Sequence, residues 1–417
     1  MEEWKEYRLG DVCKFQEGYV NPPQGNPEFF DGDIKWLRAT DLNDGYIYNT
    51  SRTLTELGYM SAKKSAILFE PGSIAISKSG TIGRLGILKD YMCGNRAVIN
   101  IIPKSFVNTY FIFCMLRSFR HNFPLLAVGS VQKNLYISIL EEIKIILPNL
   151  GLQTKIASIL KSLDDKIEVN RRINDNLEQQ AQALFKSWFV DFEPFKDGEF
   201  VESELGMIPC NLEIKRVEDI PHKIESGRRP KGGASSDGVP SIGAENIKGW
   251  GYYDYSKTKY IPSDFASSMN KGKINGYELL IYKDGGKPGY FIPNFSIFGE
   301  GFPFDEMYVN EHVFILDLKN KGYNAFAYFW FQTPYIMNQL NSLGGKAAIP
   351  GINTKDVEYM PIPSLDNMKV KEFCEYVEPL VKAVLYNSKE NARLAELRDT
   401  LLPRLMSGEL KINDISV

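Results

Sequence analysis

The chain has 417 residues, of which 43% are hydrophobic and 24% charged, and its formal net charge is −3. These values exclude a disordered chain and indicate a globular protein long enough for two to four domains. No apolar run approaches the roughly 18 residues of a membrane span. The acidic segment "MEEWKEYRLG" is not a secretory signal, and five scattered cysteines favour a reducing cytoplasm over a disulfide framework or zinc site. The slight negative charge means that any nucleic-acid partner would depend on local basic patches or on basic partner subunits.

Residues 1–148 are expected to form a first globular part. Short apolar runs typical of strands ("SIAIS", "AVINI", "IKIIL") alternate with turns rich in Gly, Pro and Asn, and "YFIFCML" predicts one buried helix. This mixture favours an α+β fold over repeated βαβ units.

Two loops of this part carry residues suited to nucleic acid. The segment "SKSGTIGR" (77–84) places two cations beside glycines and could offer backbone N–H groups and positive charge to a phosphate. A tight turn between strands explains the same segment equally well. The segment "GSVQKN" (129–134) supplies side chains that bond to base edges or phosphates. The candidate DNA contacts here are Lys78, Ser79, Thr81, Arg84, Ser130, Gln132, Lys133 and Asn134.

A helical region is expected over residues 149–207. Beyond the proline-marked strand "IILPNL", residues at alternating steps of four and three form a heptad seam with two asparagines in it. Ser162 fits a helix N-cap, which predicts a short helix, a break, and a long helix from about 163 to 189. Residues 190–207 are expected to be a linker. The seam residues expected to pair are Leu163, Ile167, Asn170, Asn174, Leu177 and Leu184.

The second half of the chain repeats the first. "LLAVGSVQKNLYISILEEIKIILPNL" (125–150) aligns without a gap with "LNSLGGKAAIPGINTKDVEYMPIPSL" (340–365). Residues 208–363 are therefore expected to be a second globular part, with "LLIY" and "VFILDL" as strands, and 364–417 a second helical region. Pro379 suits a first helical turn, so its long helix is expected from 379 to about 405. The matching seam residues are Leu380, Val384, Asn387, Asn391, Leu394 and Leu401.

The second globular part has its own candidate contacts. "ESGRRPKGG" (225–233) is the most basic stretch of the chain, although cationic surface loops without a partner are common. Three lysines fall in segments that align with the loops of the first part. The candidates are Arg228, Arg229, Lys231, Lys283, Lys287 and Lys346. His312 aligns with Ala97 and is expected to be an ordinary strand residue.

The two seams predict that the helices pair. Asparagines at matching positions can meet as amide pairs, which lowers stability but fixes register. A two-fold relation between the repeats makes the pair antiparallel and places Asn170 opposite Asn391 and Asn174 opposite Asn387. The predicted architecture is α+β, with two globular domains in tandem, each followed by a long helix, and the helices paired as an antiparallel coiled coil with pseudo-two-fold symmetry.

The segment "LPNLGLQTKIASILKSLDDKIEVNRRINDNLEQQAQALFKSWFVDFEPF" resembles the central conserved region of the specificity (S) subunits of Type I restriction–modification enzymes. "SKSGTIGRLGI" and "VGSVQKNLYISIL" resemble segments of that family's target recognition domains. The resemblance covers the whole chain, in the order recognition domain, helix, recognition domain, helix. In the second copy, "YKDGGKPGYF" replaces "SKSGTIGRLG", which fits a different half-site.

The resemblance implies a non-catalytic subunit that reads a bipartite, asymmetric sequence in double-stranded DNA, one half per recognition domain. Its helices would dock methyltransferase (M) subunits, and a restriction (R) subunit would complete the complex. No cofactor is expected in this chain, because S-adenosylmethionine, ATP and Mg are expected on the partner subunits.

Two other functions stay open. One is a stand-alone DNA methyltransferase or nuclease. "NPPQ" (21–24) resembles the Asn/Asp-Pro-Pro-aromatic tetrad of amino-methyltransferases, but Gln24 cannot stack on a flipped base. No glycine-rich cofactor turn, metal motif or catalytic triad spacing accompanies it. The other is a scaffold that binds proteins through its helices without reading DNA.

Overall fold

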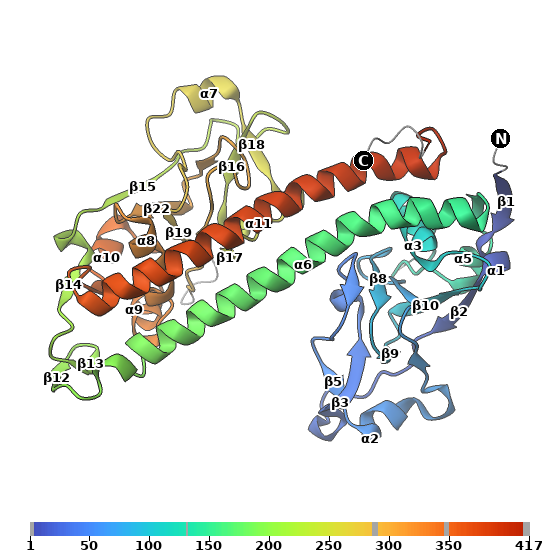
Figure 1. Ribbon diagram of the computed structural model, residues 1–417, viewed down its shortest axis with the longest axis horizontal. Helices are drawn as coiled ribbons and strands as arrows, with labels where there is room; N and C mark the ends of the chain where they lie inside the picture. Colours follow the sequence, from blue (N-terminus) through green and yellow to red (C-terminus); the bar gives the residue numbers. More distant parts are fainter. Residues whose placement is uncertain (1–3, 131, 286–290, 346–349, 412–417) are drawn as a thin grey trace. The chain divides into compact units, whose positions relative to one another are not determined.

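The computed structural model describes residues 4–130, 132–285, 291–345 and 350–411, and the chain divides into two compact units. Unit 1 comprises residues 1–168 and 394–417, and unit 2 comprises residues 169–393. Each unit contains one globular part and a segment of both long helices, α6 (Leu150–Phe189) and α11 (Met368–Met406), drawn in green and red in Figure 1. No helix in the described part of the chain is long and apolar enough to span a membrane.

Unit 1 is built on a five-stranded sheet. Its strand order is β2 (Cys13–Glu17), β10 (Val98–Pro103), β7 (Ile74–Ser77), β8 (Leu85–Leu88), β4 (Tyr46–Ile47). Neighbours are antiparallel except β4 and β8, which are parallel. A smaller sheet has the order β5 (Thr53–Leu54), β3 (Phe30–Leu37), β9 (Met92–Gly94), β6 (Leu68–Phe69). The strands β7 and β8 are buried on both faces, which explains why their sequences are continuously apolar.

Unit 2 repeats this topology. Its five-stranded sheet has the order β15 (Lys223–Ser226), β22 (Val313–Asp317), β19 (Leu279–Tyr282), β20 (Phe295–Ile297), β17 (Gly249–Trp250). The last two strands are again the parallel pair. A smaller sheet has the order β18 (Lys259–Ile261), β16 (Val239–Ile242), β21 (Tyr308–Val309). The duplication deduced from the sequence is therefore present in strand order and strand direction.

The remaining elements also correspond between the units. The buried helix is α3 (Thr109–Ser118) in unit 1 and α8 (Lys321–Trp330) in unit 2. A two-stranded antiparallel sheet joins β1 (Lys5–Arg8) to β11 (Lys144–Leu147), and its counterpart joins β14 (Ile214–Arg216) to β23 (Pro361–Pro363). The short helices are α1 (Leu9–Val12), α2 (Glu56–Tyr59), α4 (Phe123–Leu126), α5 (Ile137–Glu141), α7 (Ser263–Ser267), α9 (Pro334–Gly344) and α10 (Thr354–Glu358).

The long helices differ from the sequence prediction in one respect. The predicted break before residues 163 and 379 is wrong, because α6 and α11 are continuous over 40 and 39 residues. The Ser162 hydroxyl donates to the Ile159 carbonyl at 2.7 Å, so it bonds within the helix and does not cap one. Pro379 cannot donate to the carbonyl of Glu375, but both residues are exposed, and water can satisfy that carbonyl.

The predicted linker, residues 190–207, also holds more structure than expected. It leads into an antiparallel hairpin of β12 (Phe200–Ser203) and β13 (Gly206–Pro209). Gly206, at the start of the second strand, has a φ of 89°, a backbone conformation that glycine adopts without strain. A description as a plain linker is therefore wrong for these residues.

Within unit 2, α6 and α11 lie side by side and run in opposite directions (Figure 1). Asn170 Nδ2 donates to Asn391 Oδ1 at 2.9 Å, and Asn387 Nδ2 donates to Asn174 Oδ1 at 2.8 Å. These are the amide pairs that the antiparallel arrangement predicted. Asn174 Nδ2 also donates to Ser388 Oγ at 3.2 Å, so the polar seam is bonded across the helices and not merely buried.

The apolar seam residues are buried or partly buried, and several of them pack on the domain cores. Ile167 and Val384 are almost fully buried. Leu177, Leu184 and Leu380 pack against the core of unit 2, and Leu401 packs against the core of unit 1. Leu163 and Leu394 are partly buried. The helices thus supply part of the hydrophobic core of each unit.

Candidate nucleic-acid interface

The first candidate loop of unit 1, residues 77–84, is the turn between β7 and β8. Gly80 and Gly83 have φ angles of 73° and 87°, which favour glycine. A Cβ on Gly83 would lie 2.9 Å from the Phe123 ring, so this glycine also permits close packing. The glycines therefore serve the geometry of a tight turn.

Backbone hydrogen bonds bring three loops of unit 1 together beside this turn. The Lys78 N–H donates to the Ala97 carbonyl at 2.8 Å, and the Leu135 N–H donates to the Lys78 carbonyl at 2.8 Å. The turn 77–84, the β9–β10 turn and the loop 129–134 therefore adjoin at one end of the central sheet. We call this arrangement the loop junction of unit 1. The sequence analysis predicted two of these loops as separate candidates and did not single out the third.

The candidate side chains of unit 1 differ in how available they are. Lys78 Nζ lies 2.7 Å from Glu17 Oε1, and the lysine side chain is only 14% exposed, so its charge is largely neutralised within the protein. A hydrogen bond to the same carboxylate raises the pKa of Tyr19. Arg84 and Lys133, by contrast, form no ion pair with any described residue.

The other candidates of unit 1 lie on the same two loops. Thr81, Ser130 and Gln132 are exposed, whereas Ser79 is partly buried. Asn134 is also partly buried, and its Nδ2 donates to the Gln132 carbonyl at 3.0 Å, which orders the loop. The third loop adds Arg96, an exposed cation that the sequence analysis did not single out.

Unit 2 has the same junction. The Lys283 N–H donates to the His312 carbonyl at 3.0 Å, and the Ile352 N–H donates to the Lys283 carbonyl at 2.7 Å. Lys283 thus holds the place of Lys78. Lys287 and Lys346, the other candidates from this region, lie outside the described residues. The backbone framework is repeated, while the side chains on it are not.

The junction of unit 2 carries a cluster of mixed charge. His312 Nδ1 lies 2.5 Å from Asp284 Oδ1, and its Nε2 lies 3.2 Å from Glu311 Oε1. Arg229 Nε lies 3.0 Å from the same Glu311 oxygen. Lys283 Nζ lies 4.5 Å from the centre of the Phe314 ring, a cation–π distance. Carboxylates and amides at such a surface can accept from base amino groups, and the cations can bind phosphates.

The remaining basic residues of unit 2 lie on the loop after β15. Arg228 Nη2 donates to the Ser268 carbonyl at 3.4 Å, and its guanidinium carbon lies 5.6 Å from the centre of the Phe265 ring. Lys231 is exposed. Arg228 is therefore partly held by its own unit, whereas Lys231 extends into solvent.

His312 corrects one expectation. It is not a strand residue but lies in the turn just before β22, with its side chain 38% exposed between two carboxylates. Sequence analysis missed Asp284 and Glu311 as well. One signal could have found this site: His312 aligns with Ala97, so the two residues lie in corresponding loops of the duplicated scaffold. Such a loop is a place where side chains can diverge between the two copies.

The two units attach to the long helices by different contacts. In unit 1, Asp164 of α6 lies 3.0 Å from Arg117 Nη1 and 2.7 Å from Arg398 Nη1 of α11. Burial raises the pKa of Asp164, but the two guanidinium groups outweigh it and hold the pKa below its usual value. Tyr110 donates to the same carboxylate, and its pKa is raised chiefly by burial.

In unit 2, aromatic rings take the place of this network. The Phe185 ring of α6 lies 5.6 Å from the Phe329 ring of α8 and 5.8 Å from the Phe373 ring of α11. Phe189, one helical turn later, packs at 5.1 Å from Phe326. Each of these rings is at least 95% buried. Unit 1 thus adds a buried charge network to apolar contacts with the helices, since Leu160 of α6 and Leu402 of α11 lie in its core, whereas unit 2 relies on aromatic rings.

A family model described as "Type I restriction modification DNA specificity domain" matches residues 1–179. The MjaIX specificity subunit of a Type I restriction enzyme from Methanocaldococcus jannaschii is 30% identical over 436 aligned positions, which cover 99% of this chain and 95% of the relative. The chain belongs to the family of Type I restriction enzyme specificity subunits.

Further members of the family agree with this assignment. The HindI specificity subunit from Haemophilus influenzae is 25% identical over 98% of this chain and 100% of its own length. The crystal structure of a Type I restriction–modification S subunit from Mycoplasma genitalium superposes with a TM-score of 0.53 at 16% identity, covering 97% of this chain and 96% of that one. It therefore shares the fold of this specificity subunit.

Proposed function

We propose that the chain is the non-catalytic, DNA-reading subunit of a Type I restriction–modification complex. It reads a bipartite, asymmetric target in double-stranded DNA, with one half read by each globular part. The observation that carries this proposal is the repeated loop junction. The backbone bonds of Lys78 and Lys283 are equivalent, yet the surrounding side chains differ, as expected of two readers with different half-sites.

The proposed partners are the methyltransferase and restriction subunits. The paired segments of α6 and α11 offer helical surface for docking, with Val169, Ile173 and Tyr386 among the exposed apolar side chains. We assign S-adenosylmethionine, ATP and Mg to those partners and no cofactor to this chain. The proposed place of action is the cytoplasm, in keeping with the free cysteines among the described residues.

Methylation of DNA by a reconstituted complex tests the proposal. The chain is mixed with its methyltransferase subunit and labelled S-adenosylmethionine, and the modified positions in a random-sequence library are mapped. We expect methylation at one bipartite motif with a fixed spacer, and none by the chain alone. Methyl transfer by the isolated chain would favour the stand-alone enzyme. A complex that binds its partner but prefers no DNA sequence would favour the scaffold.

A further inference from the structure

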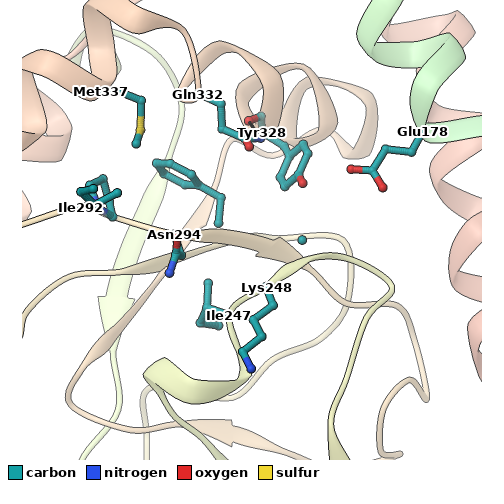
Figure 2. Close-up of a pocket in the computed structure, with 11 residues that line it drawn as sticks. Glu178, Ile247, Lys248, Ile292, Asn294, Tyr328, Gln332 and Met337 are labelled. Carbon is teal, nitrogen blue, oxygen red and sulfur yellow. Dashed lines mark hydrogen bonds between the residues drawn. The ribbon is translucent and has the colours of Figure 1, made fainter. Parts of the chain in front are cut away.

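Unit 2 contains a pocket of about 510 Å³ between α6, α8 and the start of β20 (Figure 2). Glu178 of α6 and Tyr328 and Gln332 from α8 and the turn after it form its polar side. Ile292 and Met337 are among its apolar lining residues, and Ile292 is 39% exposed. The pocket therefore offers a carboxylate together with apolar surface, a combination suited to a long cationic side chain.

The corresponding place in unit 1 is closed by the protein itself. Tyr46 lies opposite Ile87 and Trp250 opposite Ile297 in the two sheets, so Asp44 and Lys248 hold equivalent positions. The helices α3 and α8 have equivalent asparagine caps, which makes Arg120 and Gln332 equivalent as well.

In unit 1, Arg120 Nη1 lies 2.6 Å from Asp44 Oδ2, and this ion pair spans the gap between the sheet and the helix end. Lys248 and Gln332 cannot form such a pair, since neither is acidic. The space that an internal arginine occupies in unit 1 is consequently a pocket in unit 2. Because Arg120 fills this space in unit 1, the equivalent space in unit 2 has a size and shape that suit an arginine side chain.

The pocket of unit 2 has one carboxylate among its described lining residues, Glu178. Figure 2 shows this carboxylate directed toward Tyr328, and the Lys248 ammonium directed away from it. Burial raises the pKa of Glu178, and the negative charge of Asp175 raises it further. No cation is among the causes of this shift, so the ionised carboxylate is not stabilised by a positive charge of the described chain. An incoming cation would supply that compensation, whereas a DNA phosphate would be repelled.

We propose that this pocket receives an arginine side chain of the methyltransferase subunit. The inference rests on the proposed function, because it names a contact through which that subunit docks on α6. The guanidinium forms a charge-assisted hydrogen bond with Glu178, and the Gln332 amide oxygen can accept a second one. The aliphatic stem of the arginine packs against the apolar side of the pocket. Unit 1, whose own Arg120 fills the equivalent space, offers no such socket.

Isothermal titration of the full-length chain with the purified methyltransferase subunit tests the pocket. Glu178→Gln removes the charge but keeps an acceptor for Tyr328. We expect at least tenfold weaker binding, a factor equal to about 1.4 kcal/mol, and a loss that shrinks as salt is raised. The matched control is Glu375→Gln, because Glu375 is an exposed carboxylate on α11 of the same unit that does not line the pocket. The control should bind within about twofold of the wild type, the spread expected of an exposed charge.

A second variant fills the pocket from inside. Lys248→Asp with Gln332→Arg rebuilds the ion pair of unit 1, and we expect it to weaken methyltransferase binding tenfold or more without lowering the thermal midpoint. Wild-type affinity in both Glu178→Gln and this double variant would overturn the assignment of the pocket, as would equal losses in Glu178→Gln and Glu375→Gln. If the wild-type chain does not bind the methyltransferase subunit at all, the proposed docking function is wrong. The proposal that an arginine of that subunit occupies the pocket is then wrong as well.

Discussion

The two globular parts share a strand order and apolar contacts with the long helices, but each adds a different cluster of buried side chains to that attachment. In unit 1 the Asp164 carboxylate gathers Arg117 and Arg398, and in unit 2 the Phe185 ring stacks among other aromatic rings. Charge paired with charge and rings packed on rings can each hold the long helices against the buried helix of a globular part, α3 in unit 1 and α8 in unit 2. The apolar strand pattern defines the common fold, and the contacts around it could diverge after duplication without altering that fold.

The largest expected effects come from breaking these two attachments. Asp164→Asn leaves the charges of Arg117 and Arg398 partly uncompensated in a buried site and should cost about 3–5 kcal/mol of unfolding free energy. Phe185→Ala leaves a cavity among the rings and should cost a similar 3–5 kcal/mol. Urea unfolding at neutral pH measures both. A loss under 1 kcal/mol in either variant would show that the attachment is not as tightly coupled to folding as its contacts indicate.

The same two variants separate further with pH. The folded-state pKa of Asp164 lies below its unfolded value, so its contribution to stability is present above the unfolded pKa of about 3.9. That contribution is lost as pH falls through the folded pKa. The difference between wild type and Asp164→Asn should therefore narrow below about pH 4, whereas the difference for Phe185→Ala should not. Unfolding curves collected between pH 3 and pH 7 provide the check, and parallel behaviour of the two variants would contradict the account.

A smaller effect is expected from the loop junction of unit 1. Arg84→Ala with Lys133→Ala removes two cations that have no ion-pair partner in the described structure. If both bind phosphates, the slope of log K against log salt for target DNA should fall by about 1.8 units. Lys78→Ala, the matched control, should change the slope little because Glu17 already neutralises that lysine. An unchanged slope in the double variant would show that Arg84 and Lys133 do not bind phosphates. A large change in the control would show that the Lys78–Glu17 ion pair opens when DNA binds.

In unit 2 the equivalent comparison uses Arg228 and Arg229. Arg229 is paired with Glu311, while Arg228 is held only by a carbonyl and a ring. We therefore expect Arg228→Ala to lower the salt slope of DNA binding by nearly one unit and Arg229→Ala to lower it by less. The same titration measures both, and equal effects would show that the ion pair opens on binding.

The smallest effect concerns the helix seam. Replacing Asn170, Asn174, Asn387 and Asn391 together by Leu removes both partners of each amide pair, so stability should rise by about 1–2 kcal/mol at most. The uniformly apolar seam should hold its register less firmly, and methylation by the complex should then tolerate a wider range of spacers. Higher stability with an unchanged spacer would show that the amides do not set the register.

Much of the fold could be predicted from the sequence because its signals are periodic or repeated. Strands such as β7 and β19 stand out as apolar runs at matching positions. The matching positions of the asparagines in the two seams correctly predicted which asparagines pair. The predicted breaks failed because a lone Ser162 or Pro379 signals a helix start only weakly. Apolar packing on the buried side of the helix and water on the exposed side can carry a helix past either residue.

The candidate interface was less predictable. The Lys78–Glu17 pair and the grouping of His312 with Asp284 join residues far apart in the chain, and no local pattern encodes such contacts. The pocket beside Glu178 is open because Lys248 and Gln332 cannot form the ion pair that Asp44 and Arg120 form in unit 1. This difference becomes visible only when the two folded repeats are compared. Loop composition indicated where contacts with DNA could occur but not which charges the protein itself neutralises.

Exchange of one globular part tests the central claim most directly. Residues 1–148 are replaced by the corresponding domain of the Haemophilus influenzae relative, and the methylated positions produced by the reconstituted complex are mapped against those of the wild type. We predict that one half of the motif changes completely while the other half and the spacer stay the same. A change in both halves, or in neither, would contradict the account of two independent readers on one pair of helices.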